Sequence, residues 1–158
     1  MAELSPDGLV VDGVSVTIDG DLILAPVSFV VEPGTSAAIV GPSGSGKTTL
    51  LDCLVALRTP STGRIWLGDK AISDLQEPAA SDFRRTAVGM ISQDADLLEE
   101  LDVVDNVALV TRFNGVQPAV ARAAARSQLT SVGLAGREGE RVGHLSRGEA
   151  HRAAIARA

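Results

Sequence analysis

The run from Gly41 to Thr49 constrains the fold of this chain more than any other segment. It reads Gly-Pro-Ser-Gly-Ser-Gly-Lys-Thr-Thr and follows the pattern G-x-x-x-x-G-K-S/T. The apolar stretch Ser36–Val40 before it predicts a buried strand, and the leucine spacing of Thr48–Leu57 after it predicts a helix. Glycines let several backbone N–H groups point into one concavity. A strand, a glycine-rich loop and a helix in this order therefore predict a phosphate cradle in an α/β fold.

The loop residues have separate expected roles toward a nucleotide, which we expect to be ATP with Mg²⁺. Lys47 bridges the β- and γ-phosphates, Thr48 offers its hydroxyl to Mg²⁺, and Thr49 reaches the α-phosphate. The helix that starts at Lys47 adds the positive end of its dipole. The predicted nucleotide-binding set in the loop is Gly41, Pro42, Ser43, Gly44, Ser45, Gly46, Lys47, Thr48 and Thr49. A GTPase is disfavoured, because it needs a guanine-reading Asn-Lys-x-Asp and neither lysine, Lys47 or Lys70, follows an Asn.

Composition limits the partners of this chain. Its 158 residues suffice for one ordinary domain, and 45% hydrophobic with 22% charged residues is typical of a globular protein. The net charge of −6 gives no general attraction to nucleic acid or anionic lipid. The single cysteine, Cys53, excludes an internal disulfide and fits a reducing compartment. No segment reads as a signal peptide or membrane-spanning helix, so we expect any membrane contact to come from the water side.

The predicted elements are mainly strands in the first part of the chain and helices in the second part. Besides the strand before the loop, strands are predicted at Leu9–Ile18, Val27–Val31, Arg64–Leu67 and Thr86–Ser92. Helices are predicted at Val103–Phe113 with Asp102 as N-cap, at Pro118–Val132, and from Arg147 to the end. The order predicts one domain over 1–158, with a β-rich phosphate-loop core at 1–92 that includes antiparallel N-terminal strands, and a helical subdomain at 93–158.

A second motif stands at the start of the last helix. It reads Leu145-Ser146-Arg147-Gly148-Glu149. Ser146 and Glu149 have the spacing of a capping box, in which each residue satisfies a backbone N–H of the other. Taken alone, the motif indicates a well-capped helix.

Together, the two motifs resemble those of the nucleotide-binding subunits of ATP-binding cassette (ABC) transporters. Gly41–Thr49 matches the Walker A motif, Gln93 matches the Q-loop glutamine, and Leu145–Glu149 resembles the signature motif L-S-G-G-Q. The resemblance extends from Leu9 to Ala158 and is nearest to the branch serving lipoprotein release and macrolide export.

The resemblance implies a composite ATP site and an ATPase coupled to transport. Two such domains pair head to tail, and each ATP lies between one Walker A loop and the partner's signature helix. Ser146, Gly148 and Glu149 would then face the γ-phosphate, while Gln93 would organise Mg²⁺ and the attacking water. Lys47 and Gln93 are the expected catalytic residues, and Thr48 and Gln93 the expected contacts to the metal. The partners would be a second ATPase subunit and a membrane permease, at the inner face of the cell membrane and on its cytoplasmic side.

Two other classes stay open at this point. A soluble ABC protein without a transporter would carry the same motifs, although the tandem cassettes or long insertions usual in that class are not seen in this chain. A P-loop small-molecule kinase would share the phosphate loop, but the motif Leu145–Glu149 argues against it.

The chain also departs from the family pattern. Ile18 stands where the family has an aromatic residue that stacks on adenine, so we expect looser selection of the base. In the signature motif, Arg147 replaces a glycine and Glu149 replaces the glutamine. Arg147 either adds a charge-assisted phosphate contact or crowds the site, and Glu149 brings negative charge close to the phosphate. The sequence stops at Ala158, before the Walker B and switch-histidine segments. We therefore expect the N-terminal portion of a longer cassette, able to bind nucleotide and inactive as an ATPase by itself.

Overall fold

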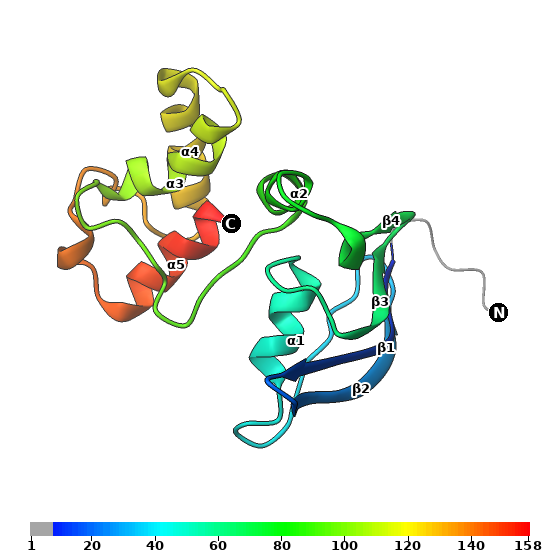
Figure 1. Ribbon diagram of the computed structural model, residues 1–158. Coiled ribbons are helices and arrows are strands. Elements are labelled where there is room, and N and C mark those ends of the chain that lie inside the picture. The colour runs from blue at the N-terminus through cyan, green and yellow to red at the C-terminus, as the bar shows by residue number, and fades with distance from the viewer. Residues whose placement is uncertain (1–7) are drawn as a thin grey trace. The chain divides into compact units, whose positions relative to one another are not determined.

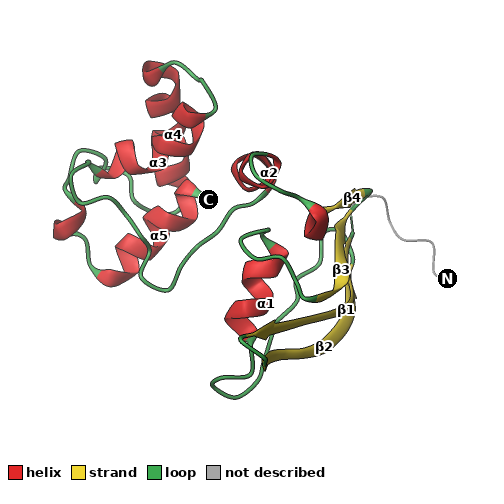
Figure 2. Ribbon diagram, in the orientation of Figure 1, coloured by secondary structure: helices red, strands yellow, loops and turns green. Residues whose placement is uncertain are grey.

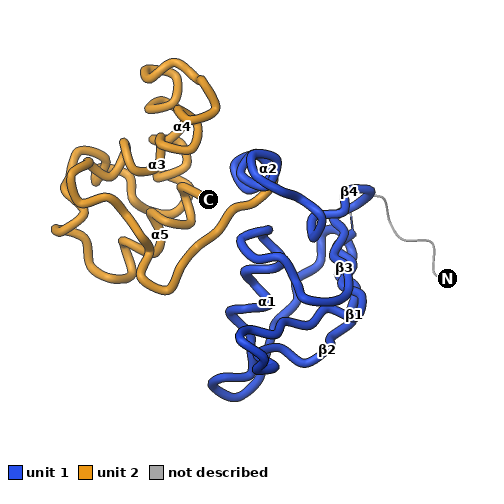
Figure 3. The backbone as a smooth tube through the Cα atoms, viewed as in Figure 1, with its two compact units in different colours: residues 1–86 blue, residues 87–158 orange. Residues whose placement is uncertain are grey.

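The computed structural model describes residues 8–158 of the chain. These residues form two compact units that divide between Thr86 and Ala87 (Figure 3). The division falls before the predicted change from β-rich to helical texture after Ser92. Each unit is described by itself.

An antiparallel sheet organises the first unit (Figure 1). Its strands are β1 (Leu9–Ile18), β2 (Asp21–Val31), β3 (Thr62–Leu67) and β4 (Lys70–Ala71), in the order β2-β1-β3-β4. Every neighbouring pair is antiparallel. Buried apolar side chains anchor the sheet: Val11, Val14, Val16, Leu24 and Ile65. The predicted N-terminal antiparallel strands are thereby confirmed, with β1 at the predicted bounds.

The β1–β2 pair is irregular near its turn. Val16 pairs with Leu24 and the next residue, Thr17, pairs with Leu22, so Ile23 is an extra residue in β2. Such a β-bulge bends a strand and re-aims its side chains. β2 also starts at Asp21 rather than at the predicted Val27 and continues through Pro26. β2 tolerates this proline because it lies at the edge of the sheet, where a missing N–H breaks no interior ladder.

The phosphate loop leads into helix α1 (Lys47–Leu54), which contacts β2 and lies beside the strands in Figure 2. Its buried residues are Leu50 and Cys53, whereas Leu51 and Leu57 of the predicted leucine spacing are exposed. The helix ends before the predicted Leu57, because Ala56 adopts a left-handed conformation with φ 54°. A left-handed residue cannot continue a right-handed helix.

Three elements of the first unit were not predicted. They are the short strand β4, the 3₁₀ turn η1 (Ile72–Asp74) that follows it, and helix α2 (Ala79–Ala87), which closes the unit. Phe83 is buried on the inner face of α2, and Arg84 donates a hydrogen bond to the carbonyl oxygen of Ala56 at 2.6 Å. The helix is thereby tied to the turn that ends α1.

Two predicted strands are wrong. Residues 35–42 carry no regular secondary structure, and the segment predicted as a strand at Thr86–Ser92 begins as the end of α2 and continues without regular structure. A strand needs a hydrogen-bonded neighbour, and within residues 8–158 neither segment joins the sheet of β1–β4. Their apolar side chains are accordingly exposed, Val40 by 86% and Met90 by 51%.

Three helices build the second unit: α3 (Val103–Phe113), α4 (Pro118–Ser131) and α5 (Arg147–Arg157), with a 3₁₀ turn, η2 (Val142–His144), before α5. All three helices were predicted within one residue of their observed bounds. Their facing surfaces bury one apolar cluster: Val103, Val104, Val107, Ala108, Ala121, Ala125, Leu129, Leu134, Ala153 and Ala156. The alanines on α4 and α5 are small and fill the space between closely packed helices.

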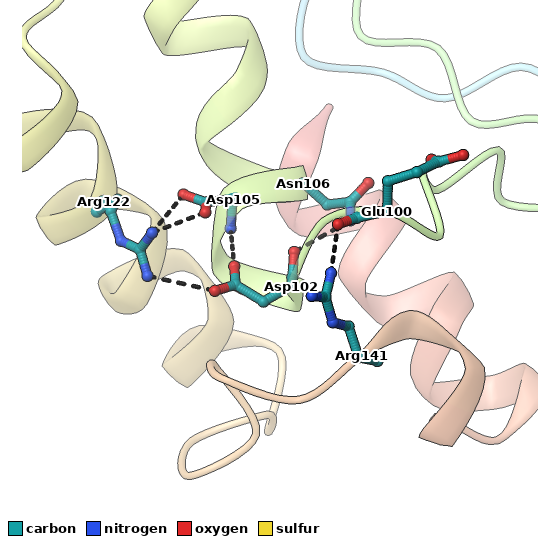
Figure 4. A network of polar contacts seen from close by, with 6 residues as sticks. All are labelled: Glu100, Asp102, Asp105, Asn106, Arg122 and Arg141. Carbon is teal, nitrogen blue, oxygen red and sulfur yellow. Dashed lines mark hydrogen bonds and ion pairs between the residues drawn. The ribbon is translucent and has the colours of Figure 1, made fainter.

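A polar network fixes the start of α3 (Figure 4). The carboxylate of Asp102 accepts from the backbone N–H of Asp105 at 2.8 Å, which confirms the predicted N-cap. Arg122 of α4 donates to both oxygens of Asp105 at 2.7 Å and to Asp102 at 3.3 Å. Buried Asn106 accepts from Leu98 N at 2.7 Å and donates to Leu98 O at 2.9 Å. The chain before α3 is thereby held to the helix that follows it.

No helix within residues 8–158 is long and apolar enough to cross a membrane.

Candidate functional site

The loop before α1 surrounds a hollow of about 270 Å³. The hollow is lined by Ser43, Gly44, Gly46, Lys47, Thr48 and Thr49 from the loop and the first turn of α1, and by Ile23 from β2. The lining residues carry hydroxyl, ammonium and backbone N–H groups beside apolar surface. These donor groups are of the kind that binds phosphate oxygens.

Gly46 is required where the loop meets β2. It is the N-cap of α1 and has φ 82°, a left-handed conformation that favours glycine. A Cβ atom at this position would lie 2.6 Å from the carbonyl oxygen of Ile23 and 3.1 Å from Cδ1 of Leu24. The loop therefore lies directly against the bulged part of β2, and only glycine fits between them.

Lys47 folds back over the loop. Its Nζ donates to the carbonyl oxygens of Gly41 at 2.9 Å and of Pro42 at 2.7 Å. The flexible lysine stem holds three donors on a single cationic centre. The ammonium group is thereby kept at the loop, and Lys47 is one of the residues that line the hollow.

The N-terminus of α1 is not neutralised by the protein itself. No side chain caps it, and no acidic residue occurs in its first turn. The first N–H groups of a helix have no partner within the helix, and the helix dipole places partial positive charge there. This end of α1 therefore favours an anion, and Lys47 adds a full positive charge beside it.

The same hollow can accommodate a magnesium ion bound to a nucleotide. Thr48 is an exposed residue of the lining and carries a hydroxyl, and Mg²⁺ takes oxygen ligands from side chains, phosphates and water. No group of three or more His, Cys, Asp or Glu side chains that could hold a metal is found within residues 8–158. The donor set fits a metal that is shared with phosphate oxygens rather than enclosed by carboxylates.

Gln93 lies in an exposed turn of the second unit. The turn continues through Ala95 and Asp96, which have φ 66° and 45°. Arg157, in the last turn of α5, donates to the carbonyl oxygens of Ala95 at 3.0 Å and Asp96 at 2.5 Å. The turn that carries Gln93 is thereby anchored to α5, while the contact of Gln93 with Mg²⁺ and water stays a prediction.

The signature turn at the other end of α5 is closed on itself. Oε2 of Glu149 accepts from the backbone N–H of Ser146 at 2.8 Å and from its hydroxyl at 2.7 Å, and Ser146 Oγ lies 3.3 Å from the backbone N of Glu149. The predicted capping box is confirmed. These hydrogen bonds, first that from the Ser146 hydroxyl, hold the pKa of Glu149 below its ordinary value.

The environment of the capping box adds positive charge. Arg137 Nη1 lies 3.5 Å from Oε1 of Glu149. Arg147 and Gly148 are exposed beside it. A Cβ on Gly148 would meet only Nη1 of Arg152, at 3.8 Å, so the turn has room on this side. The contacts of Ser146, Gly148 and Glu149 with a phosphate stay predictions.

The structure places Ile23, not Ile18, at the phosphate loop. Ile18 ends β1 opposite Asp21 and is not among the residues that line the hollow. Its role as a platform for the base stays a prediction. Ile23 was missed because nothing in the sequence indicates a β-bulge, and the bulge decides which side chains of β2 reach the loop.

Comparisons with known proteins identify the family of this chain. Residues 24–158 match the family described as "ABC transporter", and the chain belongs to that family. The resemblance of its motifs to ABC nucleotide-binding subunits is thereby confirmed.

Named relatives agree with the lipoprotein-release branch. The lipoprotein-releasing system ATP-binding protein LolD of Nitratidesulfovibrio vulgaris is 41% identical over 151 residues, which cover 93% of this chain and 65% of the relative. LolD of Coxiella burnetii is 42% identical over 137 residues, which cover 86% of this chain and 59% of the relative. The chain thus spans less than two thirds of the length of these curated relatives.

A solved structure confirms the fold. The ATP-binding cassette MJ0796, in a dimeric post-hydrolysis state bound to ADP and Pi, matches with a TM-score of 0.84 at 27% identity. The match covers 94% of this chain and 68% of that chain. The predicted α/β fold of the ABC ATPase type is therefore confirmed.

Proposed function

We propose that this chain is the ATP-binding part of an ABC transporter ATPase subunit, which couples ATP binding and hydrolysis to transport through a separate membrane protein. One observation carries the proposal: Lys47 and the uncapped first turn of α1 line one hollow in a chain of the ABC family. Lys47 exchanges the carbonyl oxygens of Gly41 and Pro42 for the β- and γ-phosphates of ATP.

The other loop residues divide the work of holding the nucleotide. The backbone N–H groups of Gly41–Thr49 surround the phosphate chain, and Thr49 reaches the α-phosphate. Thr48 supplies one oxygen ligand to Mg²⁺, which neutralises charge on the β- and γ-phosphates when it is bound. Gln93 orients the attacking water and senses the state of the nucleotide.

A second cassette completes the site. Ser146, Gly148 and Glu149 of one cassette face the γ-phosphate held by the loop of the other, in a head-to-tail pair. Support comes from the dimeric state of MJ0796 named with its bound ADP and Pi. The relatives named for a lipoprotein-releasing system support a membrane permease as the further partner, with this subunit at the inner face of the cell membrane.

Equilibrium binding tests the first half of the proposal. Calorimetric titration of the purified chain with ATP in the presence of Mg²⁺ is expected to give saturable binding of one nucleotide per chain. Absence of saturable binding contradicts the proposal, because the hollow would then not hold a triphosphate.

Co-purification tests the second half. In native membranes, the tagged chain is expected to be recovered with an integral membrane protein, and the recovered amount should change when ATP is added. Recovery with soluble partners alone would favour an ABC protein without a transporter. Appearance of a phosphorylated metabolite on incubation with ATP would favour a small-molecule kinase.

A further inference from the structure

The turn that carries Gln93 is bracketed by contacts with the end of α5. Before the turn, Gly89 lies so close to this helix end that a Cβ atom built on it would be 2.7 Å from the backbone oxygen of Ala158. After Gln93, the guanidinium group of Arg157 donates hydrogen bonds to two carbonyl oxygens of the turn. Gln93 is exposed between these two contacts, so the end of one helix holds the chain on both sides of it.

The turn itself has an uncommon backbone conformation. The backbone N–H of Ala95 donates to the carbonyl oxygen of Ser92 at 3.3 Å, so Gln93 is the second residue of a four-residue turn. Ala95 and Asp96 have φ 66° and 45°, in the left-handed region that residues with a Cβ atom rarely adopt. Such a conformation persists only where surrounding contacts enforce it. The turn therefore depends on contacts from other segments.

Arg157 supplies such a contact with two nitrogens of one side chain. Nη2 donates to the carbonyl oxygen of Ala95 at 3.0 Å, and Nη1 donates to that of Asp96 at 2.5 Å. The planar guanidinium group thereby holds two consecutive carbonyl oxygens on the same side of the chain. Rotation of either peptide unit out of this arrangement would break one of the two charge-assisted hydrogen bonds.

Helix α5 is a firm base for this arginine. Ala153 and Ala156 of α5 belong to the buried apolar cluster of the second unit, and Ala154 is fully buried as well. On the far side of the turn, buried Asn106 of α3 holds the backbone of Leu98 through both its N–H and its carbonyl oxygen. The segment that carries Gln93 is thus held from two packed helices of its own unit.

We propose that Arg157 is a positioning residue for Gln93, which holds the turn in the conformation from which the Gln93 amide reaches the Mg²⁺ of bound ATP. This inference rests on the proposed function, in which Gln93 contacts the metal and the attacking water. Mg²⁺ demands a narrow ligand geometry, so a glutamine on a turn that is fixed in advance contributes more than one on a free turn. Arg157 acts through the turn and needs no contact with the nucleotide.

A comparison of ATP binding with and without Mg²⁺ tests this role. The full chain is titrated with ATP in excess Mg²⁺ and again in EDTA, and the ratio of the two affinities measures what the metal contributes. Gln93→Ala should lower this ratio by about tenfold, the loss typical when a group around a metal is removed. Arg157→Met keeps the hydrocarbon stem, removes the donors and should lower the ratio by about threefold. Neither variant should change the affinity in EDTA, where the phosphate loop alone binds ATP.

The double variant of Gln93→Ala with Arg157→Met separates positioning from general support. Without the amide there is nothing for Arg157 to position, so the double variant should have the same ratio as Gln93→Ala alone. Independent effects would instead multiply to about thirtyfold, and that result overturns the positioning role. Arg112→Met is the matched control, because Arg112 is an exposed arginine in the last turn of α3, as Arg157 is in the last turn of α5. It should leave the ratio unchanged, and a loss equal to that of Arg157→Met overturns the role as well.

A second variant covers the case that Arg157→Met does not fold. Circular dichroism measures whether the helix content of the wild type is kept. If it is lost, Arg157→Lys decides, because it keeps the positive charge at the end of α5 and loses the planar fork of donors. A ratio about twofold below that of the wild type then supports the positioning role, and an unchanged ratio overturns it.

The remaining outcomes separate this inference from the proposed function. An unchanged ratio in folded Arg157→Met, or an equal loss of affinity with and without Mg²⁺, overturns the positioning role. An unchanged ratio in Gln93→Ala removes the metal contact of Gln93 and this inference with it. In each of these cases, binding of ATP that depends on Lys47 still upholds the phosphate loop as the nucleotide site. If the wild type does not bind ATP, both proposals fail.

Discussion

Two helix N-termini in this chain are both expected to face phosphate, and they differ in structure. The N-terminus of α1 follows a glycine loop, has no side-chain cap, and has no acidic residue in its first turn. The N-terminus of α5 is capped by Ser146, and Glu149 returns the hydrogen bond to the backbone of Ser146. Both motifs are expected to face phosphate, yet only α1 leaves its donors and its positive dipole without a partner from the protein.

A motif that is expected to face phosphate therefore does not always leave its hydrogen-bond donors free. At α1 no side chain caps the helix, so its first N–H groups are left for an external anion, and Lys47 is held nearby by loop carbonyl oxygens. At α5 the carboxylate of Glu149 already accepts from the N–H and the hydroxyl of Ser146. The start of α1 thus needs no second helix to bind an anion. The start of α5 has its cap hydrogen bonds within the protein and needs no anion to complete them.

The largest expected effect falls on the loop lysine. Lys47→Ala should weaken ATP binding by about a hundredfold, because it removes charge-assisted hydrogen bonds to the phosphates. Calorimetric titration measures the change. Lys70→Ala is the matched control, since Lys70 is the only other lysine and lies over the ring of Phe83 at 5.2 Å, away from the loop. Comparable losses in both variants would show that general charge, not the loop, binds the nucleotide.

The next largest effect concerns the contact between the loop and β2. Gly46→Ala should lower the free energy of unfolding by at least about 2 kcal/mol, because it adds backbone strain to an overlap with the carbonyl oxygen of Ile23. Gly44→Ala is its control: φ is 80° there, but no atom lies within 4 Å of an added Cβ. Only strain of about 1 kcal/mol is then expected. Urea denaturation followed by the fluorescence of Trp66 compares them, and equal losses would refute the close approach.

A smaller effect is expected at the cap of α5. Ser146→Ala removes the hydroxyl of the capping box and should cost about 1 kcal/mol of stability. Thr48→Ala makes the corresponding change in the first turn of α1, where no side-chain cap is lost, and should change stability by less than about 0.5 kcal/mol. Denaturation followed by circular dichroism measures both. Should the two variants lose the same stability, the contrast between the helix ends would be wrong.

The smallest expected effect is on the pH dependence of stability. The Ser146 hydroxyl and then its backbone N–H lower the pKa of Glu149 in the folded chain. The charged carboxylate therefore contributes stability above its unfolded-state pKa, and this contribution is lost as the pH falls through the lowered folded-state pKa. Glu149→Gln keeps the capping geometry and should flatten this part of the acid profile. Denaturation between neutral and acidic pH measures the stability profile. Glu99→Gln, which removes one exposed carboxylate outside the capping box, is the control. If Glu149→Gln left the acid profile of stability unchanged, the charge of Glu149 would make no contribution to the stability of the folded chain.

Short-range signals in the sequence predicted much of the fold. The caps at Asp102 and Ser146, Pro118 at the start of α4, and the alternation in Leu9–Ile18 each predicted an element that the structure confirms. Each of these signals depends only on residues that are close together in the sequence, so each can be recognised without knowing how the chain folds. The same holds for the phosphate loop, whose glycines and lysine all lie within the short run Gly41–Lys47.

Long-range pairing explains what sequence reasoning missed. Ser36–Val40 has the composition of a strand, but composition does not supply a hydrogen-bonded neighbour. The bulge at Ile23 depends on how β1 and β2 pair, and the glycine at Gly46 depends on that bulge. Neither contact can be predicted from the loop alone.

The motifs in the sequence were enough to identify a phosphate loop and a capped signature helix of the ABC family. That Ile23 borders the loop, and that the start of α1 is uncapped while the start of α5 is capped, became known from the folded chain. A motif specifies which hydrogen-bond donors exist, whereas packing and hydrogen bonding with other segments decide which of those donors remain available.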